Sequence, residues 1–300
     1  MSSAKTAKPS LFIVGAPKCG TTAWVQYLKT HPDICFSPIK EPHYFCFDLK
    51  WRYFHSEQEY LKLFEGCGSA KVVAEASVRY LVSTAAAENI KRFDPEAKII
   101  IFVRDQADHL PSLHNQMLYR SEDWIEDFEE AWKLSDQRAG STSARTKEPK
   151  FLDYKALGRF SEQVERYFDT FPADQIRLFH FRDWSRDPRQ TYLEILRFGG
   201  LPDDGRTDFP KINEAKHQRA RWLAGLLIKP PQLLRPLARL LKRLPGNPVD
   251  KLVGMGLRLN RRPGYLGETS EALRDEIRAY YAADNALLEP RIWKPSRTGS

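Results

Sequence analysis

Residues 11–22 read Leu-Phe-Ile-Val-Gly-Ala-Pro-Lys-Cys-Gly-Thr-Thr, and this stretch decides the fold of the chain. Four apolar residues run into Gly15, which predicts a buried strand that ends there. Small residues follow, and residues 23–28 have helical spacing, so the pattern predicts a strand, a tight loop and a helix. Such a loop directs backbone N–H groups at one point, and the helix terminus adds about half a positive charge. We therefore interpret residues 15–22 as a phosphate-binding loop.

The position of Lys18 separates this loop from the standard nucleotide-binding loop. In a Walker loop, Gly-x4-Gly-Lys-Ser/Thr, the lysine follows the second glycine and the hydroxyl holds Mg²⁺. Gly15 and Gly20 have the Walker separation, but Lys18 lies between them, and Thr21 and Thr22 follow. The alternative is an ordinary strand-to-helix turn with an incidental lysine.

The order Pro-Lys-x-Gly-Thr-Thr resembles the 5′-phosphosulfate loop of sulfotransferases that use 3′-phosphoadenosine 5′-phosphosulfate (PAPS). The resemblance is to the heparan sulfate type and its bacterial relatives, and it covers roughly residues 10–200 and 260–290. It implies that PAPS is the sulfuryl donor and that no metal is required. The implied ligands of the donor's 5′ end are Pro17, Lys18, Cys19, Gly20, Thr21 and Thr22.

Buried strands alternate with helices along most of the chain. Further strands are predicted at Lys71–Glu75, Lys98–Val103 and Gln175–Phe181. Helices are predicted at Thr84–Phe93, Asp108–Tyr119, Trp124–Leu134, Tyr154–Phe171, Pro188–Phe198 and Thr269–Leu288. This alternation predicts an α/β, P-loop-like three-layer fold with a central, mostly parallel sheet flanked by helices. We expect a single domain over residues 1–300, with ligands beyond the carboxyl ends of the strands.

A second phosphate site is expected at the end of the strand at residues 98–103. Arg104 follows that strand, and Ser112 lies eight residues further on. An arginine can contact a phosphate through two parallel hydrogen bonds, and a hydroxyl can complete the site. The pair resembles the family's 3′-phosphate site, although Gln106 stands where proline is commoner. The alternatives are a surface arginine at a sheet edge and, for Asp105, a Walker-type magnesium carboxylate.

A basic loop near the C-terminus is the third expected donor contact. Residues 260–266 read Asn-Arg-Arg-Pro-Gly-Tyr-Leu and resemble the loop that closes over the nucleotide in this family. The resemblance implies that Arg261 and Arg262 bind the donor. The alternative is a solvated basic turn.

Glu41 is the expected catalytic base. Residues 40–45 read Lys-Glu-Pro-His-Tyr-Phe and resemble the Glu-x-His-Phe-Phe stretch of heparan sulfate 3-O-sulfotransferases. The resemblance implies that Glu41 deprotonates the acceptor hydroxyl and that His43 supports it, and a carboxylate can do this if it is correctly positioned. The alternative is an exposed glutamate paired with Lys40.

Two residues, one at the end of the second predicted strand and one just beyond it, are expected to line the acceptor side. They are Glu75 and Arg79. The family often has a lysine directly after this glutamate, but this chain has Ala76. Arg79 can substitute for that lysine, or the acceptor differs.

Charge is distributed unevenly over the 300 residues. The net charge is +8, but residues 211–262 hold thirteen Lys and Arg against two acidic residues, a net of +11 that leaves about −3 for the remainder. Residues 213–260 are therefore predicted to form a basic, apolar helical insertion. Within it, residues 219–259 either cover the active site as a lid or contact a membrane peripherally. The basic residues of this segment are not interleaved with aromatic residues on strands, as they are in nucleic-acid-binding proteins, so no nucleic acid is expected.

The remaining sequence features bear on the cellular location. No window approaches the eighteen apolar residues of a membrane-spanning helix. Residues 1–9 are polar and are expected to be flexible, without a signal sequence. The four cysteines lack zinc-type spacing and are expected to be reduced thiols, so we expect a cytoplasmic protein.

The sequence thus predicts a PAPS-dependent O-sulfotransferase. The heparan-type resemblance favours a hydroxyl group of a glycan or glycolipid as the acceptor, and the alternative is a phenolic or other natural-product hydroxyl. One alternative is a Mg²⁺-dependent nucleotide kinase or NTPase of P-loop fold, against which the position of Lys18 argues. The other is a non-enzymatic, basic membrane-binding protein, which leaves the phosphate-binding loop without a purpose.

Replacing Lys18 by alanine is expected to lower turnover by about 10²–10³-fold, because it removes a fixed charge from the place where negative charge develops. Steady-state rates with an accepted substrate measure the loss. A loss below about tenfold would remove Lys18 from the mechanism.

Overall fold

The computed structural model describes residues 7–50, 53–138, 148–212, 216–218, 261–263 and 268–294, with the backbone alone for 216–218 and 261–263. The chain divides into two compact units. The first comprises residues 1–109, 155–213 and 274–300, and the second comprises residues 110–154 and 214–273. The expectation of one domain over residues 1–300 stays a prediction.

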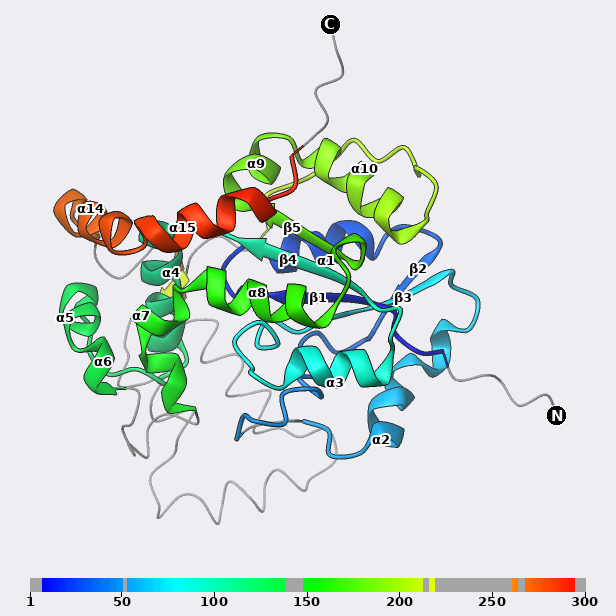
Figure 1. Cartoon of the computed structure of the whole chain (residues 1–300), viewed down its shortest axis with the longest axis horizontal. Helices are drawn as coiled ribbons and strands as arrows, with labels where there is room; N and C mark the ends of the chain where they lie inside the picture. Colours follow the sequence, from blue (N-terminus) through cyan, green and yellow to red (C-terminus); the bar gives the residue numbers. More distant parts are fainter. Residues whose placement is uncertain are drawn as a thin grey trace, which may run out of the picture. The chain divides into compact units, whose positions relative to one another are not determined.

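A five-stranded sheet forms the centre of the first unit (Figure 1). Its strands are β1 (Leu11–Gly15), β2 (Ile34–Phe36), β3 (Val72–Ala76), β4 (Lys98–Val103) and β5 (Ile176–His180). They lie in the order β2-β3-β1-β4-β5, and every neighbouring pair is parallel. The predicted α/β fold with a parallel sheet is confirmed. Strand β2 was not predicted, because three residues are too few for a periodic signal.

Helices connect the strands. Those of the first unit are α1 (Thr21–Leu28), α2 (Glu57–Leu61), α3 (Ala86–Phe93), α8 (Phe160–Thr170), α9 (Phe181–Arg186), α10 (Pro188–Gly199) and α15 (Ala282–Leu288), with short 3-10 helices η1 (Lys62–Cys67), η3 (Ala173–Gln175) and η5 (Glu289–Arg291). The second unit contains α5 (Phe128–Lys133), α6 (Ser135–Arg138) and η2 (Pro149–Leu152). Residues of α4 (Gln106–Tyr119) and α14 (Glu271–Tyr280) belong to both units, and α7 (Tyr154–Leu157) begins at their boundary.

Aromatic side chains fill both faces of the sheet. On one face, Trp24 of α1 stacks on Phe102 of β4 at 5.4 Å between ring centroids and meets Trp184 of α9 edge-on. On the other, Phe12 of β1 meets the ring of Phe45 at 5.8 Å. Because successive side chains of a strand point to opposite faces, strands buried on both sides read as continuous apolar runs. That is why β1 and β4 could be identified from the sequence.

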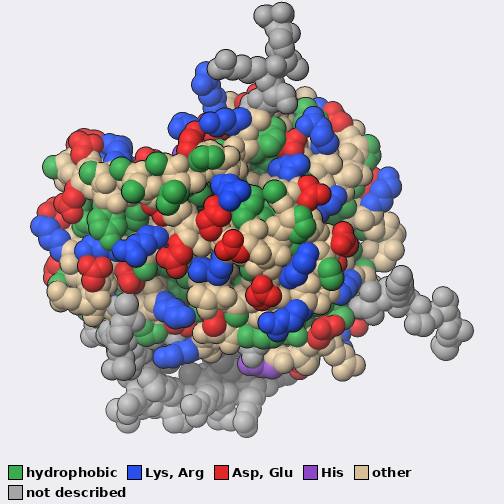
Figure 2. Space-filling view, in the orientation of Figure 1, with side chains coloured by type: hydrophobic (Ala, Val, Ile, Leu, Met, Phe, Trp, Pro, Cys, Tyr) green, Lys and Arg blue, Asp and Glu red, His purple; other side chains and the backbone are tan. Residues whose placement is uncertain are grey.

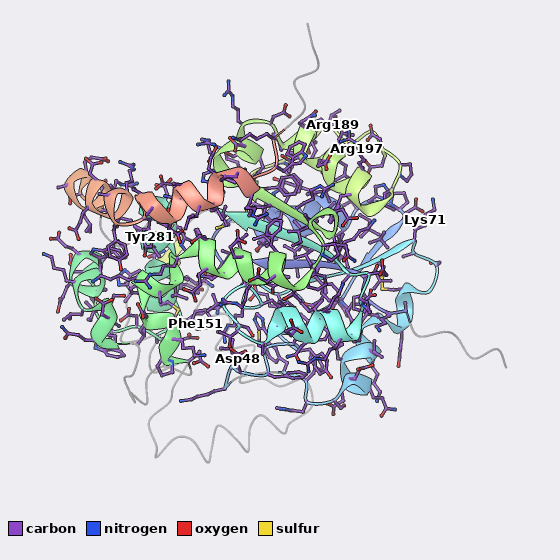
Figure 3. All side chains as sticks on the ribbon, in the orientation of Figure 1. Asp48, Lys71, Phe151, Arg189, Arg197 and Tyr281 are labelled. Carbon is purple, nitrogen blue, oxygen red and sulfur yellow. A yellow bond between two sulfur atoms is a disulfide. The ribbon has the colours of Figure 1, made fainter. Side chains whose placement is uncertain are left out.

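Two long helices expected from the sequence are interrupted. The helix expected at residues 154–171 breaks at Gly158, where an added Cβ would lie 2.4 Å from the hydroxyl of Tyr281. That hydroxyl donates to the carbonyl of Lys155 at 2.8 Å, and Figure 3 labels the tyrosine. The helix expected at 269–288 is divided at Tyr281 into α14 and α15. The break at Gly158 thus coincides with a tertiary contact of Tyr281, which helical periodicity does not contain.

The second unit holds a buried ion pair and a short antiparallel pair of strands. Arg138 and the hydroxyl of Tyr154 both donate to the carboxylate of Asp123, and the tyrosine bond is 2.6 Å long. Strands β6 (Lys216–Gln218) and β7 (Arg261–Pro263) pair with His217 opposite Arg262. They bring together the two ends of the basic segment. Apart from residues 216–218, the predicted insertion at 213–260 and its lid or membrane segment at 219–259 lie outside the described residues, as do residues 1–6 of the expected flexible terminus.

The surface of the described residues mixes both signs of charge. Figure 2 shows Lys and Arg interspersed with Asp and Glu on one face, as expected for a chain that is near neutral outside its basic segment. The bidentate pair Arg291–Glu165 is an example. Within the described part of the chain, no helix has the length and apolarity needed to cross a membrane.

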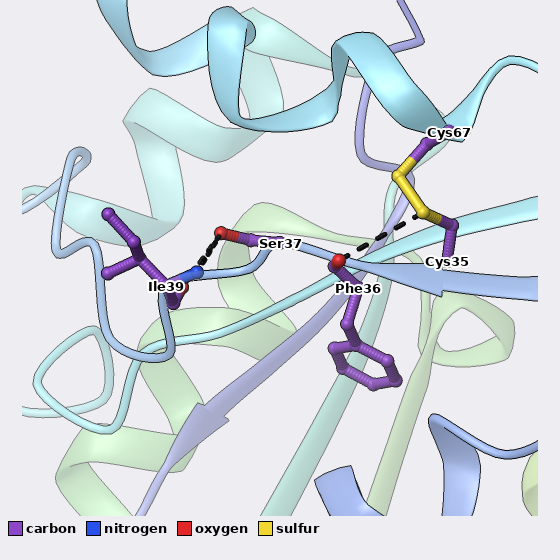
Figure 4. Close-up of a disulfide and its surroundings, with 5 residues drawn as sticks. All are labelled: Cys35, Phe36, Ser37, Ile39 and Cys67. Carbon is purple, nitrogen blue, oxygen red and sulfur yellow. Dashed lines mark hydrogen bonds between the residues drawn. A yellow bond between two sulfur atoms is a disulfide. The ribbon is translucent and has the colours of Figure 1, made fainter.

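A disulfide corrects the expectation of four reduced thiols. Cys35 of the edge strand β2 is bonded to Cys67, the last residue of η1 (Figure 4). Cys19 and Cys46 are free and buried. The cysteines are 32 residues apart, and no spacing rule pairs them. Because disulfides persist mainly in oxidising compartments, the bond removes the support that reduced cysteines gave to a cytoplasmic location, which stays a prediction.

Replacing Cys35 or Cys67 by serine is expected to lower the free energy of unfolding by about 3–4 kcal/mol, the loss that chain entropy predicts for a loop of this length. Denaturant unfolding measures it. Each single variant and the double variant should lose the same amount, and reductant should destabilise only the wild type. Identical unfolding of the wild type with and without reductant would contradict the bond.

Candidate active site

The loop after β1 has the backbone geometry of an anion cradle. Gly20 has φ +86°, and a Cβ there would lie 2.2 Å from the ring of Trp184. At Gly15 a Cβ would lie 2.5 Å from that of Leu81. Helix α1 begins directly after Gly20 without a side-chain cap and without an acidic residue in its first turn. Its first N–H groups and its dipole therefore favour an anion, which fits a phosphate group.

The side chains of the loop divide into accessible and buried ones. Lys18 is only partly buried and has φ 66°, a backbone conformation that favours glycine. Pro17 and Thr21 are buried, and Thr22 is partly exposed. Cys19 is completely buried, and burial raises the pKa of its thiol to about 12. This thiol is therefore neutral and packs beneath the loop.

Glu41 and His43 lie on a loop that is bonded to the end of β3. The backbone N–H of Glu41 donates to the carbonyl of Ala76 at 2.9 Å, and that of His43 donates to Oγ of Ser77 at 3.0 Å. Their φ angles are 66° and 53°. Among the described residues, only one other non-glycine residue besides these two and Lys18 has a positive φ, namely Ser121. Such strained residues concentrate at functional sites, where the surrounding structure holds them.

Two charged or titratable side chains lie beside the carboxylate of Glu41. Lys40 Nζ donates to Oε1 at 2.5 Å, and Nε2 of His43 lies 3.4 Å from Oε2. Burial acts to raise the pKa of Glu41, but His43 and Lys40 together hold it well below its ordinary value. For His43, burial lowers the pKa. The hydrogen bond and charge of Glu41 oppose this shift, and the charges of Arg79 and Lys40 increase it. At neutral pH this is an ionised carboxylate beside a neutral imidazole.

Glu75 has the opposite environment. It is 1% exposed, and its Oε2 accepts hydrogen bonds from the hydroxyls of Tyr60 and Tyr80, each at 2.8 Å. Burial raises its pKa to about 7, although hydrogen bonds from Ser77 and the two tyrosines act to lower it. The structure thus holds this residue beneath the site. Arg79 is also buried, and its charge acts on His43.

The residues after β4 form the second expected phosphate site. The guanidinium of Arg104 lies over the ring of Phe181 at 4.5 Å and is partly exposed. Asp105 accepts a hydrogen bond from the N–H of Ala107 at 2.8 Å and so caps α4, a structural use of the carboxylate considered for Mg²⁺. Ser112 belongs to the second unit, where it is buried in α4.

Gln106, which stands where proline is commoner, has a tertiary role. Its amide exchanges two hydrogen bonds with the amide of Asn285 in α15, at 3.0 and 3.1 Å. It also donates to the carbonyl of Gly158 at 3.1 Å. The glutamine therefore ties α15 to the start of α4.

For Arg261 and Arg262, the expected donor ligands of the basic loop, the structure gives only the backbone of β7.

Comparison with known proteins gives this geometry a family. Residues 8–216 match the family model described as "Sulfotransferase domain". The chain belongs to the sulfotransferase family. The predicted PAPS-dependent class of enzyme is thereby confirmed, and the kinase and non-enzymatic alternatives are set aside.

Individual sulfotransferases are similar at low identity. A bifunctional heparan sulfate N-deacetylase/N-sulfotransferase 1 of Caenorhabditis briggsae is 25% identical over 235 residues, which are 75% of this chain and 26% of that protein. Carbohydrate sulfotransferase 15 of Mus musculus is 28% identical over 250 residues, and the match covers 64% of this chain and 44% of that protein. The chain thus spans about a quarter to a half of these relatives. The crystal structure of a sulfotransferase from Alicyclobacillus acidocaldarius is 28% identical, with a TM-score of 0.62, and the match covers 84% of this chain and 99% of that one.

Two groups at the sulfotransferase site were not found from the sequence. His109 is completely buried, and burial, with the charges of Arg104 and Lys18, lowers its pKa to about 3. This neutral ring thus lies within electrostatic reach of both expected phosphate sites. Trp184 packs against Gly20 from α9, more than 160 residues further along the chain. Neither residue lies in a recognisable motif, so only tertiary structure reveals them.

Replacing Lys40 by glutamine is expected to move the acidic limb of the pH–rate profile upward. The pKa of Glu41 is depressed in the folded enzyme, so a base of this kind stays active until the pH falls through that low value. Without the charge of Lys40, burial raises the pKa of Glu41 with less opposition, so activity should be lost at a higher pH. Profiles of kcat/KM from about pH 2 to about pH 9 compare the two enzymes. Superimposable acidic limbs would mean that Lys40 does not control the base.

Proposed function

We propose that this chain transfers the sulfuryl group of PAPS to a hydroxyl group of a carbohydrate-containing acceptor. PAPS supplies an activated sulfuryl group with a phosphate leaving group. The names of the relatives support the acceptor class, since they include a heparan sulfate N-sulfotransferase and a carbohydrate sulfotransferase. The proposed O-transfer is supported by a carboxylate base on the acceptor side.

One observation carries the proposal: the loop with Glu41 and His43 is bonded to the end of β3, directly beside the end of β1. Ile13 of β1 pairs with Ala76 of β3, and the N–H of Ser77 donates to the carbonyl of Ile13 at 3.0 Å. The base and the lysine-bearing loop therefore follow two adjacent parallel strands. In sheets of this kind, ligands bind beyond the carboxyl ends of the strands.

Glu41 would accept the acceptor proton as the hydroxyl attacks. The carboxylate is ionised at neutral pH, which is the state that a base requires. Its low pKa makes it a weak base while Lys40 is bound to it. An acceptor that draws Lys40 away would strengthen the base at the moment of reaction, since proton transfer improves as the pKa approaches the working pH. His43, held by Ser77, would keep the carboxylate oriented.

The donor side of the proposal rests on fixed positive charge. Lys18 and the N–H groups at the start of α1 would stabilise the negative charge that grows on the leaving phosphate. Arg104 and Ser112 would hold the 3′-phosphate and so favour PAPS over ATP. Arg261 and Arg262 remain proposed donor ligands on the same grounds of resemblance. Arg79 remains a proposed acceptor-side charge.

An acceptor with an apolar portion, such as a glycolipid, is favoured within this class. The loop that carries Glu41 also carries Ile39 and Phe47, which are 44% and 49% exposed. Large apolar side chains at this exposure are suited to an apolar ligand surface. A screen with labelled PAPS should compare free glycans, glycolipids and phenols that share similar hydroxyl groups. Preferential labelling of phenols would overturn the carbohydrate assignment.

Donor binding tests the reaction class without any acceptor. Calorimetry should detect adenosine 3′,5′-bisphosphate in the absence of metal, and ADP with Mg²⁺ should bind more weakly. Tighter binding of ADP with Mg²⁺ would contradict the proposed donor.

Replacing Glu41 by glutamine keeps the shape of the side chain but removes its capacity to accept a proton. Turnover should fall by roughly 10²–10⁴-fold, while the affinity for adenosine 3′,5′-bisphosphate should barely change. Replacing the exposed Glu57 of α2 by glutamine is the matched control and should leave both unchanged. Near-normal turnover of the Glu41 variant would place the base elsewhere, with His43 the next candidate.

A further inference from the structure

Charged side chains converge at the end of β4, and the proposed function uses only Arg104 among them. Asp108 lies in the first turn of α4, and its two carboxylate oxygens face different guanidinium groups. Nη1 of Arg274, from α14, donates to Oδ1 at 2.7 Å. Nη2 of Arg104 lies 3.4 Å from Oδ2. One carboxylate therefore bridges an arginine at the end of the sheet and an arginine of the C-terminal helix.

The guanidinium of Arg104 is held in place but not saturated with acceptors. Its plane lies over Phe181, which fixes its orientation. Its Nε is buried and has no hydrogen-bond partner among the described residues. The contact of 3.4 Å to Asp108 is long, since charged N–H···O⁻ bonds are about 2.7–2.9 Å. Donor capacity is therefore left for an anion that approaches more closely.

A phosphate group would compete with Asp108 for these two arginines. Burial acts to raise the pKa of Asp108, but the hydrogen bond from Arg274 and the charge of Arg104 lower it overall. The carboxylate is therefore ionised at neutral pH. A phosphate monoester carries a charge of about −1.5 to −2, so it would repel this carboxylate while attracting both guanidinium groups. Planar guanidinium donors match phosphate oxygens as well as carboxylate oxygens.

We propose that Arg274 is a second ligand of the donor's 3′-phosphate, and that Asp108 holds Arg104 and Arg274 in position until this phosphate replaces it. The inference rests on the proposed function, because it assumes that the donor is PAPS. It identifies a specificity-determining residue that lies outside every motif recognised in the sequence. It also gives the C-terminal helix a part in distinguishing PAPS from nucleotides that lack a 3′-phosphate.

The competing explanation is that Asp108 and Arg274 only clamp α14 to α4. Arg278, one turn further along α14, lies 3.9 Å from Asp105 and would belong to the same clamp. A clamp predicts a loss of thermal stability without any change in the recognition of the 3′-phosphate. The two explanations therefore differ in one measurable ratio.

The test compares the affinities for adenosine 3′,5′-bisphosphate and adenosine 5′-monophosphate, which differ only in the 3′-phosphate. Calorimetry on the full chain gives the ratio of the two dissociation constants for the wild type and for Arg274→Gln, Arg274→Lys and Asp108→Asn. Arg189→Gln is the matched control, because the guanidinium of Arg189 is likewise paired with an aspartate, Asp203, but belongs to α10 and not to the end of β4. Figure 3 labels Arg189 on α10. Melting temperatures of all variants are measured in parallel.

Arg274→Gln should reduce the preference for the 3′-phosphate by about tenfold or more, as expected for a lost charged hydrogen bond. Arg274→Lys should retain part of it, and Asp108→Asn should increase it several-fold because the internal competitor is gone. Arg189→Gln should leave it unchanged. If the Arg274 and Asp108 variants lose thermal stability but keep the wild-type ratio, the clamp is correct and the proposal fails. If the wild type itself shows no preference for the bisphosphate, the proposed donor fails instead.

Discussion

The parallel pairing of β1 with β3 and β4 is the constraint on which the active site depends. Because the three strands run in the same direction, their carboxyl ends lie at one edge of the sheet. The chain leaving each strand is bonded to its neighbour: the N–H of Ala16 donates to Phe102 at 2.6 Å, and that of Leu81 donates to Val14 at 2.8 Å. The register of the sheet thus fixes where each functional segment begins.

Strained backbone is the second feature that this scaffold makes possible. Lys18, Glu41 and His43 adopt left-handed conformations, each of which costs of order 1–3 kcal/mol in a non-glycine residue. Backbone hydrogen bonds to the end of β3 hold the loop of Glu41 and His43 in that conformation. The proposed catalytic groups are therefore oriented before any ligand binds, which is the condition for electrostatic stabilisation without reorganisation.

The pKa values of two carboxyl groups, Glu41 and Glu75, are shifted in opposite directions. Glu41 is partly exposed and lies beside Lys40, so it is ionised. Glu75 is enclosed by tyrosines, and burial raises its pKa to about 7. Environments that push two carboxyl pKa values apart are typical of sites that need one reactive and one supporting group. The hydroxyl of Ser77 is shared by this arrangement, since it accepts from the N–H of His43.

Local pattern was sufficient for the features that depend on local physics. The apolar runs of β1 and β4 and the glycines of the loop between β1 and α1 could be recognised because strand burial and turn geometry act over a few residues. Their order predicted the parallel fold, and the resemblance of residues 17–22 to the phosphosulfate loop of sulfotransferases predicted the class of enzyme. Tertiary structure alone decided the Cys35–Cys67 disulfide, the packing of Tyr281 against Gly158 and the approach of Arg274 to Asp108. Each of these joins segments that are distant in sequence, and the packing of helices and strands that brings them together has no periodicity of its own.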